Sequence, residues 1–412
     1  MSNNGFTTRL VHADRTLNSP ESGGVHSSTS QSVLFEYADA QDLVDVFQGK
    51  KAGHVYSRSS SGSVNALQTI LSDIEGGVGA LCFATGMAAI ASSLMALLRA
   101  GDHIIVSRYL FGNTRSFMQT LEAFNVTVSY VDVTDIRNVI EAYQPNTRMV
   151  FCETIANPVT QVSDCVAIGQ FCAENQLIFM VDNTMTPAYL FDAKSVKASL
   201  VVSSLTKYIG GHGNVLGGVV VDMGEFNWQN FENIHPNYRG DDVRQWGLTQ
   251  IKKRGLRDIG ATLAPESASR LALGLETLAL RMDKACDNAL QLATWLNSNK
   301  AVAQVYYPGL AEHPQHSMAR AQFTTFGAIL SIELQSHIDP VAFLNALKLV
   351  LSATHLGDTR TLALPVASTI FFENGAKARQ EMGISDSLIR FSIGIEDIHD
   401  LIADFKQAFA QF

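Results

Sequence analysis

Between about residue 63 and residue 262, the chain repeatedly alternates short apolar stretches with longer stretches of helical periodicity. Continuous apolar stretches are typical of strands buried on both faces, and helical connections between them favour parallel pairing. The sequence therefore predicts an α/β domain over residues 63–262 with a mostly parallel, seven-stranded sheet. The expected strands are residues 79–83, 104–107, 127–131, 149–153, 178–182, 200–203 and 215–221.

The two ends of the chain differ from this middle part. Residues 1–62 are rich in Ser, Gly and Asn with little periodicity, which predicts an extended arm. Residues 263–412 open with a long helix that begins at Pro265, and they predict a smaller α+β C-terminal domain. Its expected strands are residues 304–307, 327–334 and 388–393, with closing helices near 340–349 and 396–411. Residues 224–262 are polar and are interpreted as a long loop inserted after the large sheet.

Charge and composition narrow the classes of partner and compartment. With 30 Lys and Arg against 39 Asp and Glu, the net charge of −9 disfavours nucleic acid and anionic membranes as partners. The five cysteines are scattered, mostly within apolar runs, and fit buried thiols in a reducing compartment. No metal-ligand spacing occurs, and no apolar stretch suits a signal peptide or a membrane span. We therefore expect a cytoplasmic protein without a metal.

Two polar residues stand at the ends of expected strands. Lys207 follows strand 200–203 and precedes a glycine-rich loop, and Asp182 ends strand 178–182. Ligands of open α/β sheets bind at the carboxyl ends of strands, where both residues are expected. A lysine amine that forms an imine and a carboxylate that pairs with a pyridine nitrogen are what pyridoxal 5′-phosphate (PLP) requires. Taken singly, a solvated loop lysine and a helix-capping aspartate are the alternatives.

Seven motifs, in order along the chain, resemble those of the Cys/Met-metabolism family of PLP enzymes, which includes cystathionine gamma-synthases and lyases, methionine gamma-lyases and O-acylhomoserine sulfhydrylases. The motifs are Tyr56-Ser57-Arg58, Thr85-Gly86-Met87-Ala88-Ala89, Glu153-Thr154 with Asn157-Pro158, Asp182-Asn183-Thr184, Thr206-Lys207-Tyr208, Gly274-Leu275-Glu276-Thr277-Leu278 and Arg390-Phe391-Ser392. The resemblance implies the aspartate-aminotransferase-like fold (fold type I), PLP as the cofactor and an amino-acid substrate. It also implies a homotetramer built as a dimer of dimers.

The resemblance assigns a set of residues to the cofactor phosphate. Within one subunit they are Gly86, Met87, Ser204 and Thr206. Gly86 and Met87 stand where an expected strand turns into a helix, and a helix N-terminus favours an anion. Tyr56 and Arg58 would reach the phosphate from the neighbouring subunit, because the arm is expected to contact it, and Tyr56 would also contact the substrate and take part in catalysis.

Further roles concern the cofactor ring and the substrate. Phe111 would stack on the ring at a position where many members carry Tyr, whose hydroxyl helps activate the substrate or leaving group. Phe can stack but cannot move protons, although Tyr109 could compensate. Arg390 would bind the substrate α-carboxylate, with a structural salt bridge as the alternative. Asn157 would bond the cofactor's phenolic oxygen or that carboxylate.

The departures from the family pattern favour one reaction. Phe111 suits a leaving group that needs no proton, and the segment from His355 to Thr361 is more similar to that of the sulfhydrylases than to that of the cystathionine enzymes. The resemblance therefore implies a transferase of the O-acylhomoserine sulfhydrylase or cystathionine gamma-synthase type, in methionine biosynthesis and transsulfuration. Lys207 would carry protons and Asp182 would balance the ring charge. A methionine or cystathionine gamma-lyase is the alternative, and a catalytically silent scaffold of the same fold is a third.

Overall fold

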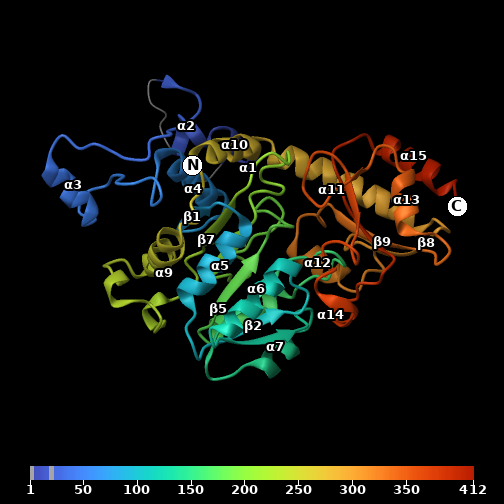
Figure 1. Ribbon diagram of the computed structural model, residues 1–412, viewed down its shortest axis with the longest axis horizontal. Coiled ribbons are helices and arrows are strands. Elements are labelled where there is room, and N and C mark those ends of the chain that lie inside the picture. Colours follow the sequence, from blue (N-terminus) through green and yellow to red (C-terminus); the bar gives the residue numbers. More distant parts are fainter. Residues whose placement is uncertain (1–3, 18–22) are drawn as a thin grey trace.

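The computed structural model describes residues 4–17 and 23–412, and it contains two sheets in two parts that lie side by side (Figure 1). The larger sheet has seven strands in the order β1-β7-β6-β5-β4-β2-β3. They are β1 (Gly79–Phe83), β2 (His103–Ser107), β3 (Thr127–Val131), β4 (Thr147–Glu153), β5 (Ile178–Asp182), β6 (Leu200–Ser203) and β7 (Gly218–Asp222). Only β7 runs antiparallel to its neighbours, so the predicted mostly parallel sheet is confirmed.

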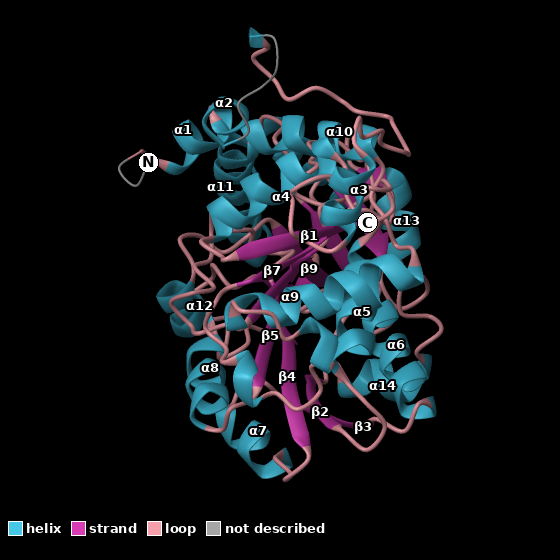
Figure 2. Cartoon of the chain, turned by 90° about the vertical axis from the view of Figure 1, so that its left-hand side faces the viewer, coloured by secondary structure: helices cyan, strands magenta, loops and turns pink. Residues whose placement is uncertain are grey.

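Helices cover both faces of this sheet (Figure 2). Successive strand residues point to opposite faces, so Val150 and Cys152 belong to one apolar core, whereas Met149 and Phe151 belong to the other. The first face is covered by α4 (Gly62–Glu75), α7 (Ile136–Ala142), α8 (Cys165–Glu174) and α10 (Pro265–Glu276), and the second by α5 (Gly86–Leu97) and α6 (Gly112–Ala123). Because each strand is buried on both sides, its apolar pattern is continuous rather than alternating.

Strand β7 begins three residues later than the sequence predicts. The main-chain N–H of Gly217 donates to the Thr206 hydroxyl over 3.0 Å, and this hydroxyl in turn donates to the Gly217 carbonyl over 3.2 Å. The chain just before Gly218 is therefore bonded to a side chain rather than to a neighbouring strand. Apolar composition alone does not reveal such a bond.

The C-terminal part contains a second sheet, in the order β10-β11-β12-β9-β8. Its strands are β8 (Val302–Tyr306), β9 (Ile329–Leu334), β10 (Leu351–Ser352), β11 (Leu362–Pro365) and β12 (Leu388–Ser392), and its other helices are α11 (Leu278–Asn297), α12 (His316–Gln322), α13 (Pro340–Ala346), α14 (Gly375–Glu381) and α15 (Ile398–Phe409). The predicted single long helix is wrong, since α10 and α11 are separated at Thr277. At this break the Arg281 guanidinium donates to Gly274 O over 2.6 Å and to Thr277 Oγ1 over 3.1 Å.

The predicted arm contains three short helices. Helices α1 (Phe6–Val11) and α2 (Ala13–Leu17) pack on the body of the protein through buried Leu10 and Ala13, so this part is not extended. Helix α3 (Ala40–Phe47) projects from the body (Figure 1). None of residues 23–60 is buried within the single chain, so this stretch keeps the character expected of an arm.

Residues 224–262 do not form the loop that their polarity predicts. They fold into 3-10 helices Trp228–Asn230, Pro236–Tyr238 and Val243–Gln245, α9 (Trp246–Gln250) and a π-helix, Ile251–Arg257. Phe226, Trp228 and Phe231 pack edge to face, and the Trp228 indole donates to an Asp222 carboxylate oxygen over 2.8 Å. A few aromatic side chains thus hold together a segment whose composition is otherwise that of a loop.

Two further expectations concern individual residue types and membranes. All five cysteines are buried and free of disulfides, as predicted. No helix among residues 4–17 and 23–412 has the length and apolarity needed to cross a membrane.

Candidate active site

One cavity of about 470 Å³ opens at the carboxyl ends of β4, β5 and β6 and is closed on one side by the C-terminal part. Nine of the eleven predicted site residues line it: Gly86, Met87, Phe111, Asn157, Asp182, Ser204, Thr206, Lys207 and Arg390. Residues far apart in the sequence meet here because the carboxyl ends of parallel strands share one edge of the sheet. The cavity is therefore the candidate active site.

Lys207 lies in the turn that follows β6, and its amine reaches toward the C-terminal part. Its Nζ lies 3.4 Å from Nδ1 of His355. Burial, together with the positive charge of Arg390, lowers the pKa of Lys207 to about 8. An amine with such a pKa is partly uncharged near neutral pH, so it can act as a nucleophile or as a base.

Two carboxylates stand side by side at the ends of neighbouring strands. Glu153 of β4 pairs in register with Asp182 of β5. Asp182 accepts a 2.9 Å hydrogen bond from the N–H of Thr184, but burial still raises its pKa. Burial and the charge of Asp182 raise the pKa of Glu153 to about 8. A cationic group beside Asp182 would offset the desolvation of this pair.

The turn from β1 into α5 forms an anion-binding end of the cavity. Thr85 caps the helix by accepting from Ala88 N–H over 3.0 Å, and Gly86 and Met87 stand in the first turn, whose N–H groups have no partner within the helix. Gly86 lies against Ser204, since a Cβ at Gly86 would come within 2.7 Å of the Ser204 Cβ. Only glycine permits this approach.

The predicted hydroxyls at this end differ in their availability. Ser204 lies at the cavity surface, held there by its own N–H, which donates to Thr184 Oγ1 over 2.8 Å. The Thr206 hydroxyl, in contrast, already donates to and accepts from the main chain of Gly217. Ser204 is therefore the better placed of the two to receive an anion.

Phe111 precedes α6, and its ring faces the cavity. The ring meets Phe371 edge to face, with the ring centroids 6.3 Å apart. Tyr109 does not line the cavity, because its hydroxyl donates to an Asp132 carboxylate oxygen over 2.7 Å. Burial and this carboxylate raise the pKa of Tyr109 well above its usual value. The suggestion that Tyr109 compensates for Phe111 therefore finds no support in this geometry.

Arg390 points from β12 into the cavity and is 1% exposed. Its Nη2 donates to the carbonyl of His355 over 2.9 Å, and its Nη1 lies 3.4 Å from Asn157 Oδ1. Burial lowers the pKa of Arg390 to about 10. In the described part of the chain its Nε has no hydrogen-bond partner and no carboxylate pairs with it, so a structural salt bridge is not its role. A buried cation with a free donor suits an anionic ligand.

Tyr56 and Arg58 are the two predicted residues that the structure does not bring to the cavity. Tyr56 is 46% exposed, and the Arg58 guanidinium lies 5.5 Å from the centre of its ring. Arg58 donates to the carbonyl of Arg257 over 2.8 Å. Within one chain these side chains lie outside the candidate active site.

Two residues of the site had no predicted role. Glu153 accepts the N–H of Phe111 over 2.6 Å, and it ends a strand as Asp182 does, so the strand-end rule could have found it. His355 contacts Lys207 from the loop between β10 and β11. A loop histidine gives no periodic signal, so only the fold reveals this contact.

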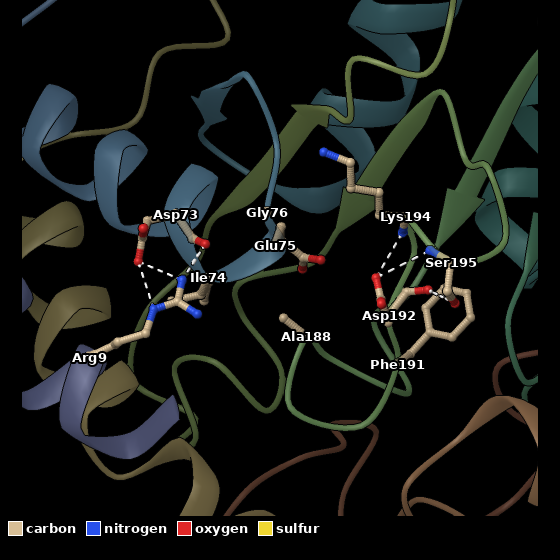
Figure 3. Close-up of a pocket in the computed structure, with 10 residues that line it drawn as sticks. All are labelled: Arg9, Asp73, Ile74, Glu75, Gly76, Ala188, Phe191, Asp192, Lys194 and Ser195. Carbon is tan, nitrogen blue, oxygen red and sulfur yellow. Dashed lines mark hydrogen bonds and ion pairs between the residues drawn. The ribbon is translucent and has the colours of Figure 1, made fainter. Parts of the chain in front are cut away.

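A second cavity, of about 490 Å³, lies between the end of α4 and residues 188–195, and Lys207 is not among its lining residues (Figure 3). Its wall includes the ion pair of Arg9 with Asp73, whose closest atoms are 2.7 Å apart, and Glu75 lies between this pair and Asp192. Glu75 accepts a 2.9 Å hydrogen bond from Asn183, and burial raises its pKa to about 7. This cavity contains none of the predicted site residues.

Comparisons with known proteins give matches over nearly the whole chain. A family model described as Cys/Met metabolism PLP-dependent enzyme matches residues 7–410. The chain is 35% identical to an L-methionine gamma-lyase of Pseudomonas putida and 33% identical to an O-acetyl-L-homoserine sulfhydrylase of Corynebacterium glutamicum, with 98% of this chain and 97% of each relative covered. A Campylobacter jejuni structure, assigned as an O-acetylhomoserine (thiol)-lyase and carrying N′-pyridoxyl-lysine-5′-monophosphate, superposes with a TM-score of 0.93 at 29% identity, covering 99% of this chain and 100% of that one.

Proposed function

The chain belongs to the Cys/Met metabolism PLP-dependent enzyme family, and from this membership we propose that it replaces the γ-substituent of an O-acylhomoserine with sulfide or a thiol. PLP is the cofactor of the family. The proposal concerns which reaction this member performs, because both γ-lyases and sulfhydrylases are among its relatives.

The residues of the candidate active site fit PLP. The aldehyde, ring nitrogen and phosphate of PLP need three groups that this cavity contains. They are a buried amine of lowered pKa, a strand-end carboxylate that pairs with no cation among the described residues, and a helix N-terminus beside a serine. The residues that would hold it are Lys207, Asp182, Phe111, Asn157, Gly86, Met87, Ser204 and Thr206. When bound, PLP supplies an aldehyde that captures amines and a ring that accepts electrons from the substrate.

The remaining chemistry belongs to side chains of the protein. Arg390 would bind the substrate α-carboxylate, because its Nε is buried and has no partner within the described chain. Lys207, when released, would take protons from the α and β carbons and return them. Its pKa of about 8 leaves part of the amine uncharged at neutral pH, which a base requires.

The lining of the cavity favours a leaving group that departs without a proton. The aromatic residue at the ring position is Phe111, and the hydroxyl of Tyr109 is bonded to Asp132 outside the cavity. Carboxylates have pKa values near 4 whereas thiols lie near 8.5, so an acyl ester loses its substituent as a stable anion and a thioether does not. Phe111 at the ring position, with no phenol among the lining residues that the same chain supplies, is the observation that carries the proposal.

A γ-lyase acting on methionine or cystathionine is the second candidate. The identity of 35% to an L-methionine gamma-lyase favours it, and elimination uses the same amine and arginine. A silent scaffold is disfavoured, because Lys207, Asp182 and Arg390 all line one cavity.

The two candidates differ in products. Purified holoenzyme is incubated with O-acetylhomoserine or O-succinylhomoserine, with and without sulfide or cysteine, and in parallel with methionine and cystathionine. We expect homocysteine or a thioether only when both an acyl ester and a sulfur donor are present. Rapid release of 2-oxobutanoate from methionine or cystathionine, without thioether formation, would establish the lyase instead.

We also propose that the arm completes the site of a neighbouring subunit in a dimer within a homotetramer. Residues 23–60 have no buried side chain in one chain, and they carry Tyr56 together with Arg58, a cation suited to phosphate.

A further inference from the structure

His355 contacts the amine that the proposed reaction uses as its base. Its Nδ1 lies 3.4 Å from Nζ of Lys207, and the two residues lie in segments that connect strands of different sheets: Lys207 follows β6, and His355 lies between β10 and β11. The contact therefore joins the C-terminal part to the strand-end edge where the cavity opens. This histidine has no other part in the proposed reaction.

Burial and the positive charges around His355 keep the imidazole neutral. Burial, together with the positive charges of Lys207, Arg390 and Arg360, lowers the pKa of His355 to about 4, against the opposing effect of Asp358. A neutral imidazole has one N–H donor and one acceptor nitrogen, whereas a lysine ammonium can only donate. With Lys207 charged, Nδ1 must therefore accept, and Nε2, which has no hydrogen-bond partner among the described residues, carries the hydrogen.

The loop that carries His355 is fixed on both sides of the imidazole. The carbonyl of His355 accepts from Arg390 Nη2 over 2.9 Å, and Gly357 N–H donates to the Ser392 hydroxyl over 2.8 Å. Gly357 has a φ of +74°, and a Cβ there would come within 2.6 Å of the main-chain nitrogen of Tyr208. The loop thus packs directly against the residue that follows Lys207, and only glycine allows it.

We propose that His355 is a positioning residue, which accepts a hydrogen bond at Nδ1 from the free amine of Lys207 and so holds that amine at one place in the cavity. Arg390 binds the carbonyl of the same residue, so one loop aligns the base with the group that would bind the substrate carboxylate. This inference rests on the proposed role of Lys207 as base, but not on which substituent the enzyme replaces. Misplacement of a catalytic group by about 1 Å can cost about 100-fold in rate.

The first test measures the amine without cofactor. In apoenzyme, the rate at which an amine-reactive reagent modifies Lys207 is followed against pH by mass spectrometry of its peptide. His355→Leu keeps the amine desolvated but removes the acceptor, so we expect the pKa of Lys207 to fall by about one unit. His355→Asn retains an acceptor near the position of Nδ1 and should restore most of that shift. His399→Leu, at an exposed histidine of α15, is the matched control.

The second test uses holoenzyme and follows exchange of the α-hydrogen of methionine for solvent deuterium, a step that needs the base but no leaving group. We expect His355→Leu to lower kcat for exchange about ten-fold or more with little change in KM, and His355→Asn to recover most of it. Melting curves verify folding, and His355→Met replaces the leucine variant if that one does not fold.

Two results would overturn the inference. The first is that His355→Leu has the same pKa of Lys207 and the same rate of α-hydrogen exchange as the wild type. The second is that His355→Asn is as impaired as His355→Leu. Persistent α-hydrogen exchange in wild-type enzyme that performs no γ-replacement would contradict the proposed function alone.

Discussion

The main-chain N–H of Phe111 donates a 2.6 Å hydrogen bond to a carboxylate oxygen of Glu153. The first residue precedes α6 and the second ends β4, so this bond ties the aromatic wall of the cavity to the edge of the sheet. Glu153 is also the register partner of Asp182. The orientation of the ring and the charge balance at the strand ends are therefore linked through one side chain.

Replacing Glu153 separates these two contributions. Glu153→Gln keeps an acceptor for the Phe111 N–H, whereas Glu153→Ala leaves that amide unsatisfied, which costs about 1–3 kcal/mol. We expect the alanine variant to bind PLP more weakly, by roughly ten-fold, and the glutamine variant to bind nearly as the wild type does. Equilibrium titration of the apoenzymes with PLP measures this, and equal weakening in both variants would argue against the hydrogen bond.

Phe111→Tyr adds a phenol at the ring position, where this chain has none. A positioned acid contributes roughly 100-fold or more in favourable cases, and a thiolate gains more from it than a carboxylate does. We expect the ratio of kcat/KM for elimination from methionine to that for O-acetylhomoserine to rise by about ten-fold or more. Phe371→Tyr is the matched control, since it adds a hydroxyl to the neighbouring ring. An unchanged ratio would mean that the phenol does not set the choice of leaving group.

Glu75 should make stability depend on pH in a defined window. Burial raises its pKa from 4.5 to about 7, so between these values the folded chain holds a proton that the unfolded chain has released, and stability falls as pH rises through this range. Glu75→Gln removes this dependence. Relative to wild type, we expect the variant to gain on the order of 3 kcal/mol between pH 4 and pH 8.

Melting temperatures of the two proteins at several pH values measure this difference. Glu141→Gln, at an exposed position of α7, is the matched control for the loss of one carboxyl group. A difference between wild type and Glu75→Gln that stays constant from pH 4 to pH 8 would show that Glu75 does not hold its proton.

Mixing two inactive variants tests the composite site. Lys207→Ala lacks the amine, and Arg58→Ala lacks the cation that the arm would deliver to a neighbour. If subunits exchange at random in dimers, about one quarter of the sites combine an intact Lys207 with an intact Arg58. We expect the mixture, after dissociation and reassembly, to recover about that share of wild-type activity. A mixture as inactive as its components would place both residues in the same site of one chain.

Most of the large sheet could be predicted from the sequence, because its strands are apolar on both faces. The predicted bounds of β1, β3, β5 and β6 are those of the structure. Strand β10 was not predicted because two residues are too few to show a pattern, and the four-residue β11 was missed as well. Helix formation in residues 224–262 depends on the packing of Trp228 with two phenylalanines, and the polar composition of the segment as a whole does not reveal this packing.

The same division holds in the candidate site. Lys207 and Asp182 could be predicted because Asp182 ends a strand and Lys207 follows one, and the topology of a parallel sheet brings them to one cavity. The contact of His355 with Lys207 depends on how the C-terminal part packs on the large sheet, and no local pattern records that packing. Whether a hydroxyl is free to bind a ligand also depends on contacts distant in the sequence, as the hydrogen bond of Thr206 to Gly217 illustrates.

The lack of any buried side chain between residues 23 and 60 has a consequence for how this protein must be handled. If Tyr56 and Arg58, two of the six residues expected at each phosphate, arrive on that stretch from another copy, the fraction of sites that hold PLP depends on the concentration of the protein itself. Specific activity would then decline in very dilute samples and return when they are concentrated, and excess PLP would slow the loss.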